Sequence, residues 1–302
     1  MTLRLGTRGS ALALAQSKLV ADAVQLHTGE KVELVEIVTA GDRSTAPVAQ
    51  LGVGVFVSAL RDALVSKEID FAVHSFKDLP TAPFEGLAIA AIPQRGDPRD
   101  ALVARDGLTL TELPDGAVIG TGALRRVAQL AALGLPLTTM PIRGNVDSRL
   151  RKVADGELDA VVVARAGLVR LGRADEVTEI LDPMLMLPAP AQGALAIEAI
   201  AARDDLIQLL AQLDDRATRG AVTAERALLA TLEAGCSAPV AALAEVTEDD
   251  EIYLRGAVIS IDGRYALRLS RTGTLADAEE VGRLLAADLL EDGADHVLGN
   301  AA

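Results

Sequence analysis

The sequence Ala117-Val118-Ile119-Gly120-Thr121-Gly122-Ala123-Leu124-Arg125-Arg126 passes from a short apolar strand through a glycine-rich turn into a helix. A helix that starts at such a turn offers free backbone N–H groups and the positive end of its dipole to an anion. Two arginines add guanidinium groups, which bind carboxylate and phosphate bidentately. This stretch therefore predicts an α/β layer that holds an anion at the end of a strand.

The basic character extends beyond this turn. From Thr121 to Lys152, six basic residues stand against one acidic residue, Asp147, so the local charge is +5 in a chain of net charge −14. The six are Arg125, Arg126, Arg143, Arg149, Arg151 and Lys152. On charge alone, a basic run is more often a solvated helix face. Because the first two arginines follow the glycine-rich turn, we favour an anion site.

The composition indicates aliphatic cores in two or three domains, because half of the 302 residues are hydrophobic but only two Tyr, four Phe and no Trp occur. The acidic net charge and the scarcity of aromatic residues argue against nucleic acid as a partner. No uncharged apolar run approaches a membrane span, and the N-terminus lacks the apolar core of a signal peptide. A single cysteine excludes an intramolecular disulfide. We therefore expect a protein of the reducing cytoplasm without membrane contact. We also expect it to be a monomer.

Strands and helices alternate through the first 95 residues. We expect strands at 3–6, 31–39 and 69–74. Ser10 caps a helix, and the apolar faces of this and the next helix carry Leu12, Ala15, Leu19, Ala23 and Leu26, and Phe56, Leu60 and Leu64. The loop from Gly41 to Val53 is long enough to be a functional lid. The alternation predicts a doubly wound α/β layer with a mostly parallel sheet.

The pattern repeats after Pro93, and then the chain changes character. Strands are expected at 101–104, 117–120, 137–142 and 158–164, and a proline-rich crossing segment follows. Two similar α/β units joined in this way suggest a cleft between lobes that binds a small ligand. The last 90 residues predict a small α+β domain with a three-stranded antiparallel sheet, because Asp262-Gly263 is a strong hairpin signal and Thr274 can cap a final helix. The predicted domains are 1–95 completed by 194–212, 96–193, and 213–302.

Candidate chemical residues follow the strand at 69–74. Ser75, Lys77 and Asp78 stand at its carboxyl end, where α/β sheets place ligand contacts. Without further context, the residues alone favour a surface ion pair of Lys77 and Asp78 over a catalytic role. Arg8 precedes a helix start and is either an anion ligand or an exposed turn residue. Three scattered histidines, of which His74 reads as structural, and one cysteine give no metal site.

Cys236 lies in the turn Glu233-Ala234-Gly235-Cys236-Ser237-Ala238-Pro239, after a predicted helix end. A lone cysteine is usually a small buried hydrophobe, and the residues alone slightly favour that interpretation.

Taken together and in order, several segments resemble the porphobilinogen deaminase (hydroxymethylbilane synthase) family, and the resemblance runs essentially end to end. They include Arg4 to Ser10, Val38 to Asp42, Ala72 to Pro80, Arg95 to Asp100, Gly120 to Arg126, Ile142 to Val146, Pro190 to Ala194, and the cysteine turn. Each segment alone is weak, but the ordered set is specific.

The resemblance implies an enzyme that polymerises four porphobilinogen molecules head to tail, with release of ammonia, to give hydroxymethylbilane. It implies a dipyrromethane primer joined by a thioether to Cys236, and three domains, of which the first two resemble periplasmic binding proteins. By family position, Ser75, Lys77, Thr121, Arg125 and Arg126 hold the primer, and Asp78 is catalytic. Substrate-binding roles fall to Arg8, Ser10, Arg143, Arg149 and Gln192. Each added pyrrole brings two carboxylates, which explains an arginine-lined site in an acidic protein.

Two positions depart from the family pattern. The family usually has two serines where this chain has Gly122 and Ala123, and a lysine in the lid where this chain has Gly52-Val53-Gly54. The alternative function is a non-enzymatic, two-lobed anion-binding protein, which would leave Cys236 and the third domain unexplained. A dinucleotide-binding interpretation is weaker, because the turn at Gly120 lacks the third glycine of that motif.

Overall fold

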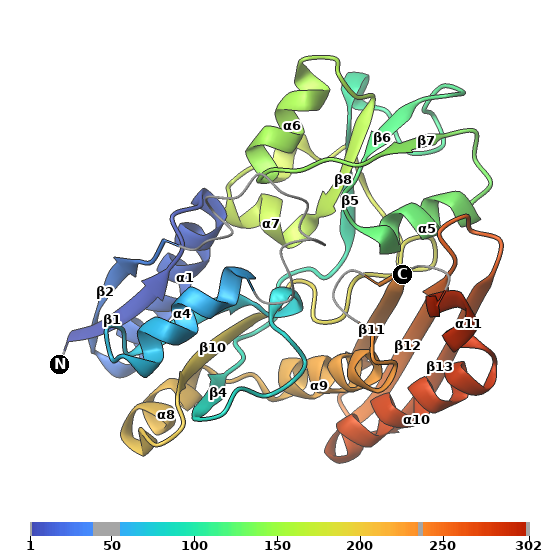
Figure 1. Ribbon diagram of the computed structural model, residues 1–302. Helices are drawn as coiled ribbons and strands as arrows, with labels where there is room; N and C mark the ends of the chain where they lie inside the picture. Colours follow the sequence, from blue (N-terminus) through green and yellow to red (C-terminus); the bar gives the residue numbers. More distant parts are fainter. Residues whose placement is uncertain (1, 39–54, 235–237, 300–302) are drawn as a thin grey trace. The chain divides into compact units, whose positions relative to one another are not determined.

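The computed structural model describes residues 2–38, 55–234 and 238–299, which form two compact units (Figure 1). The first unit comprises residues 1–96 and 194–219, and the second comprises residues 97–193 and 220–302. The predicted lid, Gly41 to Val53, and Cys236 lie outside the described residues. The three-domain division of the sequence stays a prediction.

The first unit is built on a five-stranded mixed sheet of order β2-β1-β3-β10-β4. Its strands are β1 (Thr2–Thr7), β2 (Lys31–Glu36), β3 (Phe71–Ser75), β4 (Leu87–Ala91) and β10 (Leu195–Ile200). β1 runs parallel to β2 and β3, whereas β10 is antiparallel to β3 and β4. Strand β10, which lies between β3 and β4, thus comes from a part of the chain more than 100 residues after β4.

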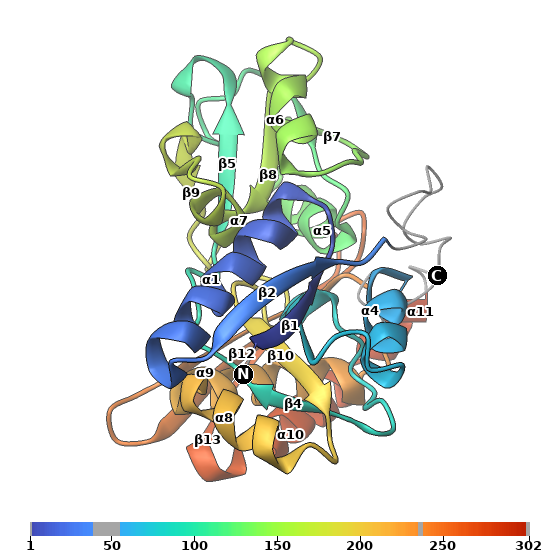
Figure 2. The ribbon, with the colours of Figure 1, turned by 90° about the vertical axis from the view of Figure 1, so that its left-hand side faces the viewer.

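Helices cover both faces of this sheet, as alternating strand residues require. On one face, α1 (Ala11–Thr28) and α8 (Asp204–Leu210) pack on Phe71 and Val73 of β3. On the other face, α4 (Val55–Val65) packs through Leu60 and Leu64. Figure 2 shows α1 lying along β1 and β2.

The second unit repeats this arrangement with the strand order β7-β6-β8-β5-β9. Its strands are β5 (Asp100–Ala104), β6 (Val118–Gly120), β7 (Thr138–Met140), β8 (Ala160–Ala164) and β9 (Glu179–Ile180), and its helices are α5 (Leu124–Ala132), α6 (Val146–Ala154) and α7 (Arg165–Arg170). β6 is parallel to β7 and β8, and β5 is antiparallel to β8. α5 packs on one face of the sheet, and α6 and α7 pack on the other.

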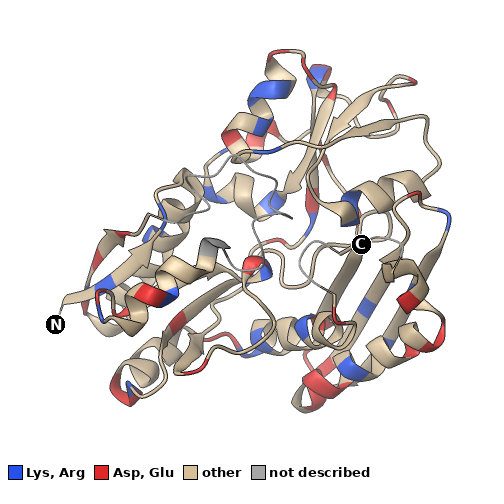
Figure 3. Cartoon of the chain, viewed as in Figure 1, with Lys and Arg blue, Asp and Glu red and all other residues tan. Residues whose placement is uncertain are grey.

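The second unit also contains an antiparallel sheet of order β11-β12-β13. Its strands are β11 (Val240–Val246), β12 (Glu251–Ile259) and β13 (Ala266–Thr274), and its helices are α9 (Arg216–Thr231), α10 (Ala278–Glu291) and α11 (Ala294–Gly299). Leu228 of α9 and Leu285 of α10 fill the core on one face. The other face packs on Ala128 of α5 and on Leu187. Acidic residues gather on α10 (Figure 3).

The predicted fold class is confirmed, namely two α/β layers and a C-terminal three-stranded antiparallel sheet. Each large sheet contains an antiparallel strand, so both are mixed. No helix of the described segments is both long and apolar enough to cross a bilayer.

Two details of the prediction are wrong. Part of the predicted apolar face of α1 is turned away from the sheet, since Leu19 is 50% exposed and Leu26 is 81% exposed, whereas Ala23 packs on the core. The buried face carries Gln16, Ser17, Val20 and Val24 instead. Thr274 ends β13 and does not cap α10, which starts at Ala278. Its hydroxyl donates to Asp277 Oδ2 over 2.7 Å.

Candidate functional site

The first unit gathers five predicted site residues at the carboxyl edge of its parallel strands. Arg8 and Ser10 follow β1, and Ser75 ends the adjacent strand β3. The Ser10 hydroxyl accepts a hydrogen bond from Ala13 N and caps α1, as predicted. Gln16 donates from Nε2 to Ser75 Oγ over 3.0 Å, so α1 and the end of β3 are joined at this edge.

Lys77 and Asp78 follow on a single 3₁₀ turn, Phe76–Asp78. Phe76 is buried, and its N–H donates to Ala194 O over 3.1 Å, which anchors the turn to the start of β10. Asp78 is exposed and Lys77 is half-buried. The turn therefore presents a carboxylate to solvent from a fixed backbone.

His74 is a structural residue, as predicted. It is buried, and its Nε2 lies 3.1 Å from Glu198 Oε2. Arg61 of α4 donates to the same carboxylate, with 2.8 Å between Nη2 and Oε1. Burial alone would raise the pKa of Glu198, but the hydrogen bonds from His74 and Arg61 outweigh it and lower the pKa.

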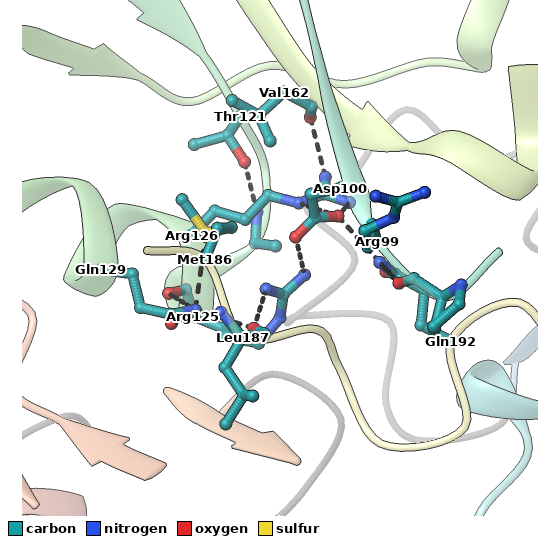
Figure 4. A network of polar contacts seen from close by, with 12 residues as sticks. Arg99, Asp100, Thr121, Arg125, Arg126, Gln129, Val162, Met186, Leu187 and Gln192 are labelled. Carbon is teal, nitrogen blue, oxygen red and sulfur yellow. Dashed lines mark hydrogen bonds and ion pairs between the residues drawn. The ribbon is translucent and has the colours of Figure 1, made fainter. Parts of the chain in front are cut away.

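In the second unit, Arg125 and Arg126 share a buried carboxylate, Asp100, at the start of β5 (Figure 4). Arg126 donates to Asp100 Oδ1 from Nε over 3.2 Å and from Nη2 over 2.8 Å. Arg125 Nη2 lies 2.8 Å from Oδ2. Each guanidinium group also donates to a backbone oxygen, Arg125 to Leu187 O and Arg126 to Val162 O.

This cluster of Arg125, Arg126 and Asp100 buries two cations and one anion. Burial alone would raise the pKa of Asp100, but the charges of Arg125 and Arg126 reverse that effect and hold the pKa well below its usual range. Burial lowers the pKa of Arg125, an effect that Asp100 only partly offsets. A buried charge without a counter-charge is costly. The cluster is therefore one anion short of neutrality.

Gln192 completes the cluster from the crossing segment, residues 187–193. Its Nε2 donates to Asp100 Oδ1 over 2.9 Å and to Pro98 O over 2.7 Å, and the residue is fully buried. The structure thus brings Gln192, Arg125 and Arg126 together around one aspartate.

Thr121 sits in the turn before α5 and is almost fully buried. Its Oγ1 accepts from Ala123 N over 3.3 Å. A Cβ on Gly122 would stand 2.7 Å from Ile142 O, so a side chain does not fit this backbone. Glycine at position 122 therefore allows the turn to lie against the backbone at Ile142.

Arg143 and Arg149 flank the start of α6, which Asn145 caps by accepting from Ser148 N over 2.9 Å. Arg149 Nε donates to Gly144 O over 3.0 Å and is half-buried, whereas Arg143 is exposed. Because β6, β7 and β8 are parallel, these residues lie at the same carboxyl edge of the sheet as the turn at Thr121.

Two charged residues of this edge were not singled out from the sequence. Asp100 belongs to the segment Arg95 to Asp100, which resembles the family. No local sequence pattern predicts that it pairs with arginines 25 and 26 positions away. Arg170, at the end of α7, donates to Gly193 O over 2.6 Å, and burial lowers its pKa to about 10. Within the described ranges no group of histidine, cysteine and acidic residues could hold a metal ion.

Comparisons with known proteins cover nearly the whole chain. Residues 3–208 match the family model described as "Porphobilinogen deaminase, dipyromethane cofactor binding domain", and residues 220–291 match "Porphobilinogen deaminase, C-terminal domain". A porphobilinogen deaminase of Nocardia farcinica is 59% identical over 99% of this chain and 89% of its own length. One of Mycobacterium tuberculosis is 57% identical over 98% of both chains.

Among solved structures, a periplasmic substrate-binding protein of an ABC transporter from Coxiella burnetii aligns with a TM-score of 0.45 at 12% identity. The alignment covers 70% of this chain and 91% of that one.

Proposed function

Because the chain belongs to the porphobilinogen deaminase family, we propose that it joins four porphobilinogen molecules head to tail into hydroxymethylbilane and releases ammonia at each step. The observation that carries this proposal is the buried arginine pair that shares the carboxylate of Asp100, in a chain that matches the family's cofactor-binding domain. A non-enzymatic anion-binding protein is not favoured, since both family models are those of the deaminase.

The charge of the second unit fits a carboxylate-bearing primer. Arg125 and Arg126 have one buried anion between them, so a further carboxylate would neutralise the cluster. We assign the primer's carboxylates to this pair, to the turn at Thr121, and to Ser75 and Lys77 of the first unit. When bound through the Cys236 sulfur, the dipyrromethane group supplies a free pyrrole carbon on which the product is built.

Substrate carboxylates are assigned to Arg8, Ser10, Arg143, Arg149 and Gln192. Arg149 is the strongest of these assignments, because the hydrogen bond from its Nε to Gly144 O fixes the guanidinium beside the cap of α6. Gln192 contributes differently, because its amide nitrogen donates to two protein oxygens. It therefore holds the cluster in place through these two hydrogen bonds.

Asp78 is assigned the chemical role. Loss of ammonia from porphobilinogen leaves a cation whose charge spreads onto the ring nitrogen, and the pyrrole that attacks it also becomes transiently cationic. A carboxylate held on the rigid turn Phe76–Asp78 can stabilise both cations and can assist proton transfer to the leaving amine. We also propose that the enzyme is a cytoplasmic monomer without a nucleic-acid partner.

Two measurements test the function. The purified chain, incubated with porphobilinogen, should release ammonia and hydroxymethylbilane. Its intact mass should exceed the sequence mass by two linked pyrroles. A chain that gains no mass and forms no product would refute the proposal.

A further inference from the structure

The crossing segment, residues 187–193, is an irregular stretch that is almost wholly buried in the second unit. Buried backbone without regular structure must find partners for its polar groups. Leu187 O accepts from Arg125 Nη1 over 2.6 Å and from Gln129 Nε2 over 2.9 Å, and Pro188 O accepts from Ala242 N of β11 over 3.0 Å. The segment is thus bonded to the arginine helix α5 on one side and to the C-terminal sheet on the other.

Ala191 is the strained point of this segment. Its φ is +60°, in the left-handed region that is unfavourable for a residue with a Cβ. Such a conformation persists only where the surroundings hold it. The holding group is Glu225, whose Oε2 accepts from Ala191 N over 2.6 Å.

Glu225 lies on α9 and is completely buried. Its second oxygen, Oε1, accepts from Ala244 N of β11 over 2.8 Å. One carboxyl group therefore ties the strained turn to the strand that also binds Pro188. A completely buried glutamate is rare in proteins, and where one occurs its carboxylate oxygens accept hydrogen bonds.

Gln192 links the strained turn at Ala191 to the cluster of Asp100, Arg125 and Arg126. Gln192 follows Ala191 directly, and its Nε2 donates to Asp100 Oδ1 over 2.9 Å. Asp100 in turn accepts from Arg126 and pairs with Arg125. We infer that Glu225 is a positioning residue, which sets the direction of the arginine pair by holding Ala191 in its left-handed conformation so that Gln192 meets Asp100.

This inference rests on the proposed function for its activity readout, and the variant Glu225→Gln tests it. Glutamine keeps the size and one acceptor oxygen but turns an NH₂ group toward one of the two backbone N–H donors. We expect kcat to fall about tenfold or more, because small misplacements of binding groups cost up to about 10²-fold. In NMR spectra of the protein before primer attachment, hydrogen exchange of the Arg126 Nε–H should accelerate.

Adding Ala191→Gly to Glu225→Gln tests whether the loss of kcat comes from the strained turn. Glycine adopts a positive φ without strain, so the turn no longer needs the carboxylate to hold it. Alone, this variant should keep kcat close to that of the parent. Combined with Glu225→Gln, it should restore most of the lost kcat and slow the exchange of the Arg126 Nε–H again.

Val258→Ala is the stability-matched control, because Val258 is fully buried in the core with α9 and α10 and lies outside the crossing segment. It should lower stability while leaving kcat and the Arg126 exchange unchanged under folding conditions. Glu225→Gln with the kcat of this control, or a double variant without rescue, would overturn the inference. A parent protein that forms no product would instead count against the proposed function.

Discussion

Arg125 and Asp100 form an ion pair with 2.8 Å between Nη2 and Oδ2, and the two side chains are 5% and 0% exposed. Asp100→Asn should keep the shape of the cluster but leave both arginines without a counter-charge. Removing one partner of a buried pair costs about 3–5 kcal/mol. Urea unfolding should show this loss, whereas Asp22→Asn, which breaks an exposed pair with Lys18, should change little. Equal stability of the two variants would mean that the buried cluster is not held by its charge.

We expect protonation of Asp97 to contribute to the loss of folded-state stability in acid. Burial alone would raise its pKa, but hydrogen bonds from Arg99 and Arg165 lower the pKa to about 2, from an ordinary value of 3.8. A depressed carboxyl pKa stabilises the folded state above the unfolded-state pKa, and this contribution is lost as the pH falls toward 2. The difference in unfolding free energy between parent and Asp97→Asn should therefore be constant above about pH 5 and shrink between pH 4 and 2. A difference independent of pH would contradict the assignment.

Cys236 is the only thiol of the chain. If it anchors the primer, Cys236→Ser should fold, show the unmodified sequence mass, and lack deaminase activity, because attachment needs a sulfur nucleophile. Intact mass spectrometry and a product assay check this. Parent protein that shows no added mass after assembly with substrate would remove Cys236 from this role.

Arg149 and Arg151 form a matched pair on α6, the first half-buried and the second exposed. Arg149→Leu should remain folded but bind substrate or elongate poorly, because a lost charged contact in a desolvated site costs about 2–5 kcal/mol. Arg151→Leu should behave like the parent. Near-normal kinetics in Arg149→Leu would assign Arg149 to the solvated face of the helix.

Asp78 should act through its charge. Asp78→Asn keeps shape and hydrogen bonding without the charge, so primer attachment should survive while turnover falls by orders of magnitude. Asp78→Glu should be damaged less, since it retains a displaced charge. Single-turnover kinetics compares the two variants. Equal turnover would show that charge at this position is not the catalytic device.

The sequence predicted the elements that have a clear period or turn signal. β3, β8 and the β12–β13 hairpin follow from apolar runs and from Asp262-Gly263, where Gly263 has a φ of +73°. The strands β4 and β9 were not predicted, because β4 is a short apolar run among prolines and β9 has only two residues.

Two features could not be read from the sequence because they depend on tertiary contacts. The buried face of α1 includes Gln16, which bonds to Ser75, so apolar spacing alone does not identify that face. The arginine pair was predicted as an anion site, but its internal partner Asp100 comes from another strand. Local sequence shows which cations are present, but it does not show which anion already lies beside them.

The place of β10 in the first sheet has a consequence for synthesis. β10 lies between β3 and β4 and pairs with both, yet it is translated after every strand of the second five-stranded sheet. On the ribosome, the sheet that begins at the N-terminus stays incomplete, with β4 lacking the neighbouring strand β10, until residue 200 has emerged. All strands of the sheet that starts later in the chain, at β5, are translated before β10, so that sheet can close while the first sheet is still incomplete.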